Sequence, residues 1–141
     1  MDFNQLIEFS SNHLYLVLAL FAILALLIGG EVRQRLSGVG EVGPGEATRM
    51  INHDHAVMID MRTDKEYRDG HVVNAIHVPS PDNLTPVEKF RDKPVIVYCN
   101  SGNRSAGFCS KLRKQGFTSV HHLKGGIIGW QKAELPLSRH N

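Results

Sequence analysis

Cysteine is scarce in this sequence, with only Cys99 and Cys109 among 141 residues. The separation of the two cysteines fits neither a Cys-x-x-Cys redox motif nor a zinc site. Eight histidines include two close pairs, but no convergent set of metal ligands accompanies them. We therefore expect no metal and no cofactor. Two free thiols are consistent with a mainly reducing compartment.

Long runs of basic residues are also absent, since no more than two cations are adjacent anywhere in the chain. The formal net charge is +2 at pH 7. An excess this small and diffuse does not indicate a nucleic-acid partner, although it suits small anionic substrates.

Charged residues are missing altogether from residues 9–30. A helix of this length extends about 33 Å, which is near the hydrocarbon thickness of a bilayer. A cleaved signal peptide would have a basic start and a small-x-small cleavage site, whereas this segment follows acidic residues and Ile28 interrupts the small-residue pattern. A buried core helix would have a polar face, which this run lacks. We therefore predict a transmembrane anchor within residues 1–30.

The first basic residues are Arg33 and Arg35, directly after this run. The positive-inside rule then predicts a single-pass membrane protein with the N-terminus outside and the rest of the chain in the cytoplasm. Residues 31–43 contain three glycines and little periodicity, so we expect a flexible linker in which Val39–Val42 is a candidate edge strand.

Residues 44–141 alternate short apolar, β-branched runs with helical patterns. This alternation predicts an α/β domain with a parallel sheet and helices on both faces. Pro44 starts a helix, Thr63-x-x-Glu66 and Thr85-x-x-Glu88 resemble capping boxes, and Gly116 ends a helix. We expect strands at 56–60, 75–78, 94–98 and 119–123, and helices at 44–51, 63–68, 85–90, 106–115 and 127–133.

The most informative stretch is the strand that ends in Cys99, followed by a polar loop and the helix at 106–115. Ligands of open α/β sheets bind at the carboxyl ends of strands, where this thiol lies. A loop that curls around one point directs several backbone N–H groups inward, and Arg104 adds a cationic fork. Both effects favour a thiolate, which is the nucleophilic form of cysteine. The alternative is that Cys99 only packs in the core as a small hydrophobic residue, which is the usual role of a free cysteine.

Three further residues are candidates near this loop. Asp60 ends the strand at 56–60, and Arg62 lies within reach of it. We interpret Asp60 as a structural residue that pairs with Arg62, and Arg62 also as a candidate for substrate binding. His71 follows a turn and is interpreted as a hydrogen-bonded structural histidine rather than a general base.

The motif Cys99-x-x-Gly102-x-Arg104-Ser105 resembles the active loop of single-domain rhodaneses, which are sulfurtransferases that carry sulfur as a cysteine persulfide. Asp60-x-Arg62, the stretch from Gly70 to Pro79, and Leu123-x-Gly-Gly with Trp130 resemble other motifs of this family in the same order. The resemblance covers residues 39–137. One departure is Asn74, where the family usually has glycine. Asparagine tolerates the positive φ that we expect in this turn.

The resemblance implies that Cys99 is the nucleophile, and that an anionic donor such as thiosulfate gives its sulfur to an acceptor thiol, possibly on a protein, or to cyanide. It also implies a substrate-binding loop made of Asn100, Ser101, Gly102, Asn103, Arg104 and Ser105. One alternative is phosphatase or arsenate reductase chemistry, but related enzymes of that kind have five residues between cysteine and arginine, and this chain has four. Another alternative is a non-catalytic binding module tethered to the membrane.

Overall fold

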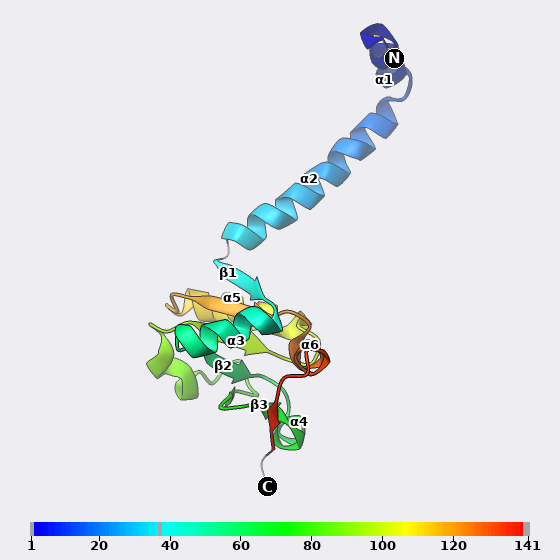
Figure 1. Ribbon diagram of the computed structural model, residues 1–141. Helices are drawn as coiled ribbons and strands as arrows, with labels where there is room; N and C mark the ends of the chain where they lie inside the picture. Colours follow the sequence, from blue (N-terminus) through cyan, green and yellow to red (C-terminus); the bar gives the residue numbers. More distant parts are fainter. Residues whose placement is uncertain (1, 37, 140–141) are drawn as a thin grey trace. The chain divides into compact units, whose positions relative to one another are not determined.

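The computed structural model describes residues 2–36 and 38–139. The chain divides into two compact units, residues 1–36 and 37–141, which we describe separately. The first unit contains helix α1 (Phe3–Asn12) and helix α2 (Leu14–Leu36) (Figure 1). Within α2, the segment Leu14–Arg33 has 20 residues, a mean hydropathy of 2.4 and no buried positions. It is therefore long and apolar enough to cross a membrane.

The uncharged run was expected to form one span from residue 9, but the structure breaks the helix at His13. The hydroxyls of Ser10 and Ser11 donate to the carbonyl oxygens of Leu6 and Glu8, at 2.8 and 2.9 Å. Serine side chains that bond to the backbone in this way compete with regular helical hydrogen bonding. The long apolar helix therefore begins at Leu14.

Most of the expected linker at residues 31–43 has regular structure. Helix α2 continues to Leu36, and strand β1 (Val39–Val42) pairs with strand β6 (Val120–Leu123), so the candidate edge strand is present. The side chain of Arg35, which contributed to the topology prediction, lies outside the described side chains.

The second unit is built on a five-stranded sheet in the order β1-β6-β5-β2-β4, and all its neighbouring strands are parallel. The remaining strands are β2 (Val57–Asp60), β4 (Ile76–His77) and β5 (Val95–Tyr98). Strand β5 lies at the centre, and its register pairs Tyr98 with Asp60 of β2. The last residues of these two strands are therefore neighbours at one edge of the sheet.

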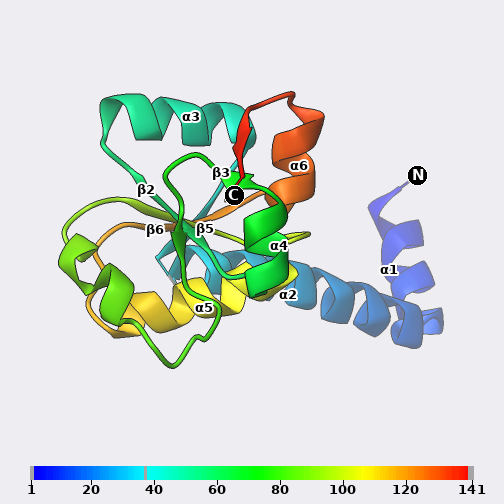
Figure 2. The same cartoon turned by 90° about the horizontal axis from the view of Figure 1, so that it is seen from below.

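Helices cover both faces of the sheet, as predicted (Figure 2). Helices α3 (Pro44–His53) and α6 (Gly126–Lys132) pack on one face, and helix α5 (Asn103–Lys114) and the 3-10 helix η1 (Thr85–Phe90) on the other. The side chains of β5 alternate between these two cores. Ile96 and Tyr98 join the α3–α6 side, whereas Val95, Val97 and Cys99 join the α5 side.

Several helix ends follow the sequence signals. Pro44 occupies the first turn of α3, and α4 (Asp64–Asp69) begins with the capping box of Thr63 and Glu66. Gly116, at φ +96°, ends α5: its N–H donates to Arg113, and the N–H of Phe117 donates to Leu112. This pair of bonds is a Schellman motif, which needs a left-handed residue at the position of Gly116.

The second predicted capping box is wrong. Thr85 lies inside η1, and the residue before this helix is Leu84, whose side chain makes no capping hydrogen bond. The structure also adds a short antiparallel pair that the sequence analysis lacked, β3 (His71–Val72) with β7 (Leu137–Ser138). Asn74 has φ +63°, so the predicted turn conformation is confirmed.

Candidate active site

Cys99 follows β5 directly, and its side chain is only 3% exposed. The backbone N–H of Gly102 donates to Cys99 Sγ at 3.1 Å. The hydroxyl of Ser105 lies 3.8 Å from the same sulfur and donates to the carbonyl oxygen of Gly102 at 3.0 Å. Ser105 is fully buried. The loop therefore closes on itself around the sulfur atom.

Two opposing effects act on the pKa of Cys99. Burial raises it, but hydrogen bonds from the backbone N–H groups of Ser105, Gly102 and Arg104, and the hydrogen bond between Cys99 and the Ser105 side chain, lower it, and the net result is a pKa below the ordinary value. Cys109 is a useful contrast, because burial and the nearby Cys99 raise its pKa to about 12. Hydrogen-bond donors around the sulfur thus distinguish the two thiols.

The start of helix α6 holds the other side of the loop. The N–H groups of Ile127 and Ile128 donate to the carbonyl oxygens of Cys99 and Asn100, at 2.9 and 3.4 Å. Gly126, at φ +56°, allows this approach, since a Cβ atom there would collide with both carbonyl oxygens. With the carbonyls held outward, the N–H groups of the loop are free to point toward the sulfur.

A residue that the sequence analysis assigned only to a helix cap also contacts the loop. The side-chain amide of Asn100 donates to Glu66 Oε1 at 2.6 Å. Glu66 Oε2 accepts from the N–H and hydroxyl of Thr63, at 3.0 and 2.9 Å. The bond from Asn100 and then those from Thr63 lower the pKa of Glu66 to about 2. The capping-box motif predicted the bond of Glu66 to Thr63, but nothing in the sequence indicated its bond to Asn100.

The remaining loop residues are exposed where they are described. Ser101 and the guanidinium of Arg104 face solvent. The side chain of Asn103 lies outside the described side chains. Within the described part of the chain, Arg104 reaches Cys99 through its backbone N–H, and its guanidinium has no hydrogen bond or ion pair. The charged fork predicted at this position is therefore available to a ligand.

Asp60 and Arg62 form the expected pair beside the end of β5. Arg62 Nη2 donates to Asp60 Oδ2 at 2.8 Å and to the carbonyl oxygen of Gly70 at 2.5 Å, and Tyr98 donates its hydroxyl to Asp60 Oδ2 at 2.6 Å. Asp60 is fully buried and Arg62 is 6% exposed. Burial lowers the pKa of Arg62, but the bonds and charge of Asp60 outweigh burial and raise it. In the described residues, the guanidinium of Arg62 has no hydrogen bond to the Cys99 loop.

His71 is buried against helix α4. Its ring stacks on that of Tyr67, with centroids 3.9 Å apart, and its Nδ1 lies 2.8 Å from the carbonyl oxygen of Tyr67. His71 thus has the surroundings of a structural histidine. Among the described residues, no group of three or more His, Cys, Asp or Glu side chains is arranged to hold a metal ion.

Comparison with known proteins decides the family. Residues 43–133 match the family model of the rhodanese-like domain. The chain belongs to this family. Family membership, together with a sulfurtransferase among its relatives, supports a sulfurtransferase-type activity for this rhodanese-like protein.

Three relatives illustrate the extent of the similarity. The uncharacterized protein YibN of Escherichia coli strain K12 is 36% identical over 140 residues, which cover 96% of this chain and 98% of YibN. A sulfurtransferase of Allochromatium vinosum is 35% identical over 92 residues, covering 63% of this chain and 84% of that protein. The crystal structure of a rhodanese-related protein from Thermoplasma volcanium has a TM-score of 0.61 at 26% identity, covering 72% of this chain and 99% of that chain.

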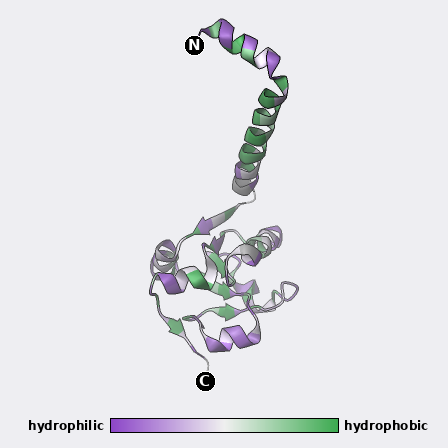
Figure 3. Cartoon of the chain, turned by 90° about the vertical axis from the view of Figure 1, so that its right-hand side faces the viewer, coloured by the Kyte–Doolittle hydropathy of each residue, from purple (hydrophilic) through white to green (hydrophobic). Residues whose placement is uncertain are grey.

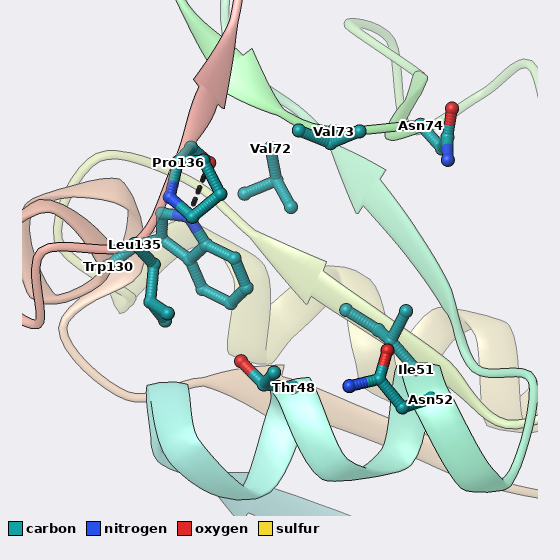
Figure 4. Close-up of a pocket in the computed structure, with 9 residues that line it drawn as sticks. All are labelled: Thr48, Ile51, Asn52, Val72, Val73, Asn74, Trp130, Leu135 and Pro136. Carbon is teal, nitrogen blue, oxygen red and sulfur yellow. Dashed lines mark hydrogen bonds between the residues drawn. The ribbon is translucent and has the colours of Figure 1, made fainter.

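The rhodanese-like domain also has a hollow, whose lining residues Figure 4 shows. It has a volume of about 320 Å³ and is lined by α3, the β3 turn, Trp130 and the segment after α6. The indole N–H of Trp130 donates to the carbonyl oxygen of Pro136 at 3.1 Å. None of its lining residues belongs to the loop 99–105. The hollow thus shares no residue with the candidate active site.

Proposed function

We propose that this protein is a sulfurtransferase that carries sulfane sulfur as a persulfide on Cys99. The observation that supports this most strongly is the ring of N–H donors around a buried sulfur atom, with Gly102 N–H at 3.1 Å. These donors lower the pKa of Cys99 and so increase the fraction of nucleophilic thiolate.

The reaction has two displacement steps. In the first, the Cys99 thiolate attacks the sulfane sulfur of an anionic donor such as thiosulfate. A new S–S bond forms, the S–S bond of thiosulfate breaks, and sulfite leaves with the electron pair. In the second, an acceptor thiolate or cyanide attacks the outer sulfur, and Cys99 is released as a thiolate.

The loop residues have separate roles in this proposal. The N–H groups of residues 100–105 stabilise the negative outer sulfur of the persulfide, much as an oxyanion hole stabilises an oxygen. The exposed guanidinium of Arg104 binds the anionic donor. Asp60 and Arg62 act from behind the loop by fixing the ends of β2 and β5.

Loop size favours sulfur transfer over phosphate chemistry. Four residues separate Cys99 from Arg104, so the ring of N–H groups surrounds a volume close to one sulfur atom. A phosphoryl group on the same thiol would place three oxygens in this smaller ring. We therefore expect little turnover of aryl phosphates.

Intact-protein mass spectrometry tests this proposal. The full chain should gain one sulfur atom from thiosulfate and lose it to cyanide. Cys99→Ser should abolish both steps, while the matched variant Cys109→Ser should behave as the unaltered protein. A protein that hydrolyses aryl phosphates and never gains sulfur would instead be a phosphatase. One that does neither would be a binding module.

We also propose that α2 anchors the protein in a membrane, with the N-terminus outside and the catalytic domain in the cytoplasm. The apolar segment Leu14–Arg33 and the absence of Lys and Arg before it support this orientation. A protease added to spheroplasts should leave the domain intact and should digest it once the membrane is permeabilised. Digestion in intact spheroplasts would reverse the orientation.

A further inference from the structure

Helix α1 has one apolar and one polar side. Phe3, Leu6 and Ile7 repeat at helical spacing and are 76%, 47% and 54% exposed, while Glu8 and Asn12 lie on the opposite side. Figure 3 shows this mixture of hydropathy along α1, in contrast to the continuous apolar colour of the α2 segment. The sequence analysis considered only the uncharged run and did not identify this pattern.

A helix of this length needs a surface to stabilise it. Helix α1 has ten residues and no buried side chain. Isolated helices shorter than about 12–15 residues are marginal in water, and most helical stability comes from packing of the apolar side. The capping box of Asp2 and Gln5 supports the first turn only. Within the described part of the chain, nothing covers the apolar side of α1.

The connection to α2 indicates what that surface is. Only His13 separates α1 from α2, and an apolar hollow is lined jointly by α1 residues and by Leu14, the first residue of α2. The apolar side of α1 is therefore continuous with the apolar helix. At 1.5 Å per residue α1 extends about 15 Å, which is too short to cross a bilayer.

The charges of α1 narrow the choice of lipid. Glu8 is its acidic residue, Asp2 caps its start, and it has no Lys or Arg. Attraction to anionic headgroups requires basic residues. Binding must therefore depend on apolar side chains, and anionic headgroups should not strengthen it.

We propose that α1 lies flat in the headgroup region of the outer leaflet, with Phe3, Leu6 and Ile7 turned toward the acyl chains of neutral lipids. This inference depends on the proposed membrane span of α2. An amphipathic helix in this position fixes the depth of the span, because it resists being drawn into the hydrocarbon and resists leaving the interface.

Tryptophan quenching by brominated lipids tests the proposal. The full chain is reconstituted in phosphatidylcholine vesicles, with tryptophan introduced as Leu6→Trp or, on the polar side, as Asn12→Trp. The signal of the native Trp130 is subtracted with the unsubstituted protein. Lipids brominated near the headgroup should quench Leu6→Trp at least twofold more than Asn12→Trp, and added anionic lipid should not increase this ratio.

The other outcomes distinguish an error in this inference about α1 from an error in the proposal that α2 spans the membrane. Protein that sediments with vesicles after alkaline carbonate washing, yet shows equal or no quenching at the two positions, would retain the span and refute the interfacial helix. If the tryptophan of Leu6→Trp were shielded from water but not quenched by brominated lipid, and cross-linking gave dimers, a second copy of the chain would cover α1 instead. Release of the protein by carbonate would refute both.

Discussion

The most decisive substitution away from the sulfur atom is Gly126→Ala. A Cβ atom at this position would collide with the carbonyl oxygen of Cys99 and lie 2.6 Å from that of Asn100. The backbone at φ +56° adds a conformational penalty of about 1 kcal/mol for a residue with a side chain. Relief of the collision breaks the bonds from Ile127 and Ile128, each with a net value of about 1 kcal/mol. We therefore expect the free energy of unfolding to fall by about 2–4 kcal/mol.

Urea unfolding of the full chain in detergent, followed by Trp130 fluorescence, measures this loss. The matched control is Gly45→Ala, because no atom lies within 4 Å of a Cβ built there. Alanine in this helix should be neutral or stabilising by up to about 1 kcal/mol. The alkylation rate of Cys99 against pH gives the second readout, and its midpoint should rise in Gly126→Ala. If Gly126→Ala matched Gly45→Ala in stability and kept the midpoint, α6 would not orient the loop.

Four further outcomes follow from the site. In the unaltered protein, alkylation of Cys99 should have its midpoint below that of an ordinary thiol, and Ser105→Ala should raise it because the side-chain hydrogen bond between Ser105 and Cys99 is lost. Asp60→Ala should lower the free energy of unfolding by about 3–5 kcal/mol in urea titrations, since it leaves a buried guanidinium unpaired. Arg104→Ala should raise KM for thiosulfate, with partial recovery in Arg104→Lys; an unchanged KM would remove this side chain from the donor site. The pKa of Glu66 is lowered from 4.5 to about 2, so its contribution to stability is complete above pH 4.5 and is lost as pH falls toward 2; the difference in urea midpoint between the unaltered protein and Glu66→Gln should therefore disappear over that range.

The sequence predicted those parts of the fold that depend on neighbouring residues. Pro44 and Gly116 mark helix ends through their own backbone preferences, and the apolar run before Cys99 can only be a buried strand or part of a buried helix. The thiol at the end of this strand and its N–H donors follow from the same local pattern. The helix after it begins at Asn103, three residues earlier than expected, because the left-handed Gly102 turns the chain directly into the first turn.

Features that join distant segments could not be predicted in this way. Strands β3 and β7 have two residues each, and only the folded domain brings His71 beside Ser138. The bond between Asn100 and Glu66 likewise depends on β2 and β5 being adjacent. Thr85-x-x-Glu88 matches the sequence motif of a capping box. However, η1 is a 3-10 helix, and Thr85 is already inside it. A short motif therefore predicts a cap only when an α-helix follows it.

The support that α6 gives to the Cys99 loop has a consequence for synthesis of the protein on the ribosome. Residues 99–105 emerge before Ile127 and Ile128, whose N–H groups hold the carbonyl oxygens of Cys99 and Asn100 outward. Until those residues have left the exit tunnel, the loop lacks the two hydrogen bonds through which α6 holds its peptide planes. The complete arrangement around Cys99 therefore forms only after a segment that follows it in the chain has folded against it.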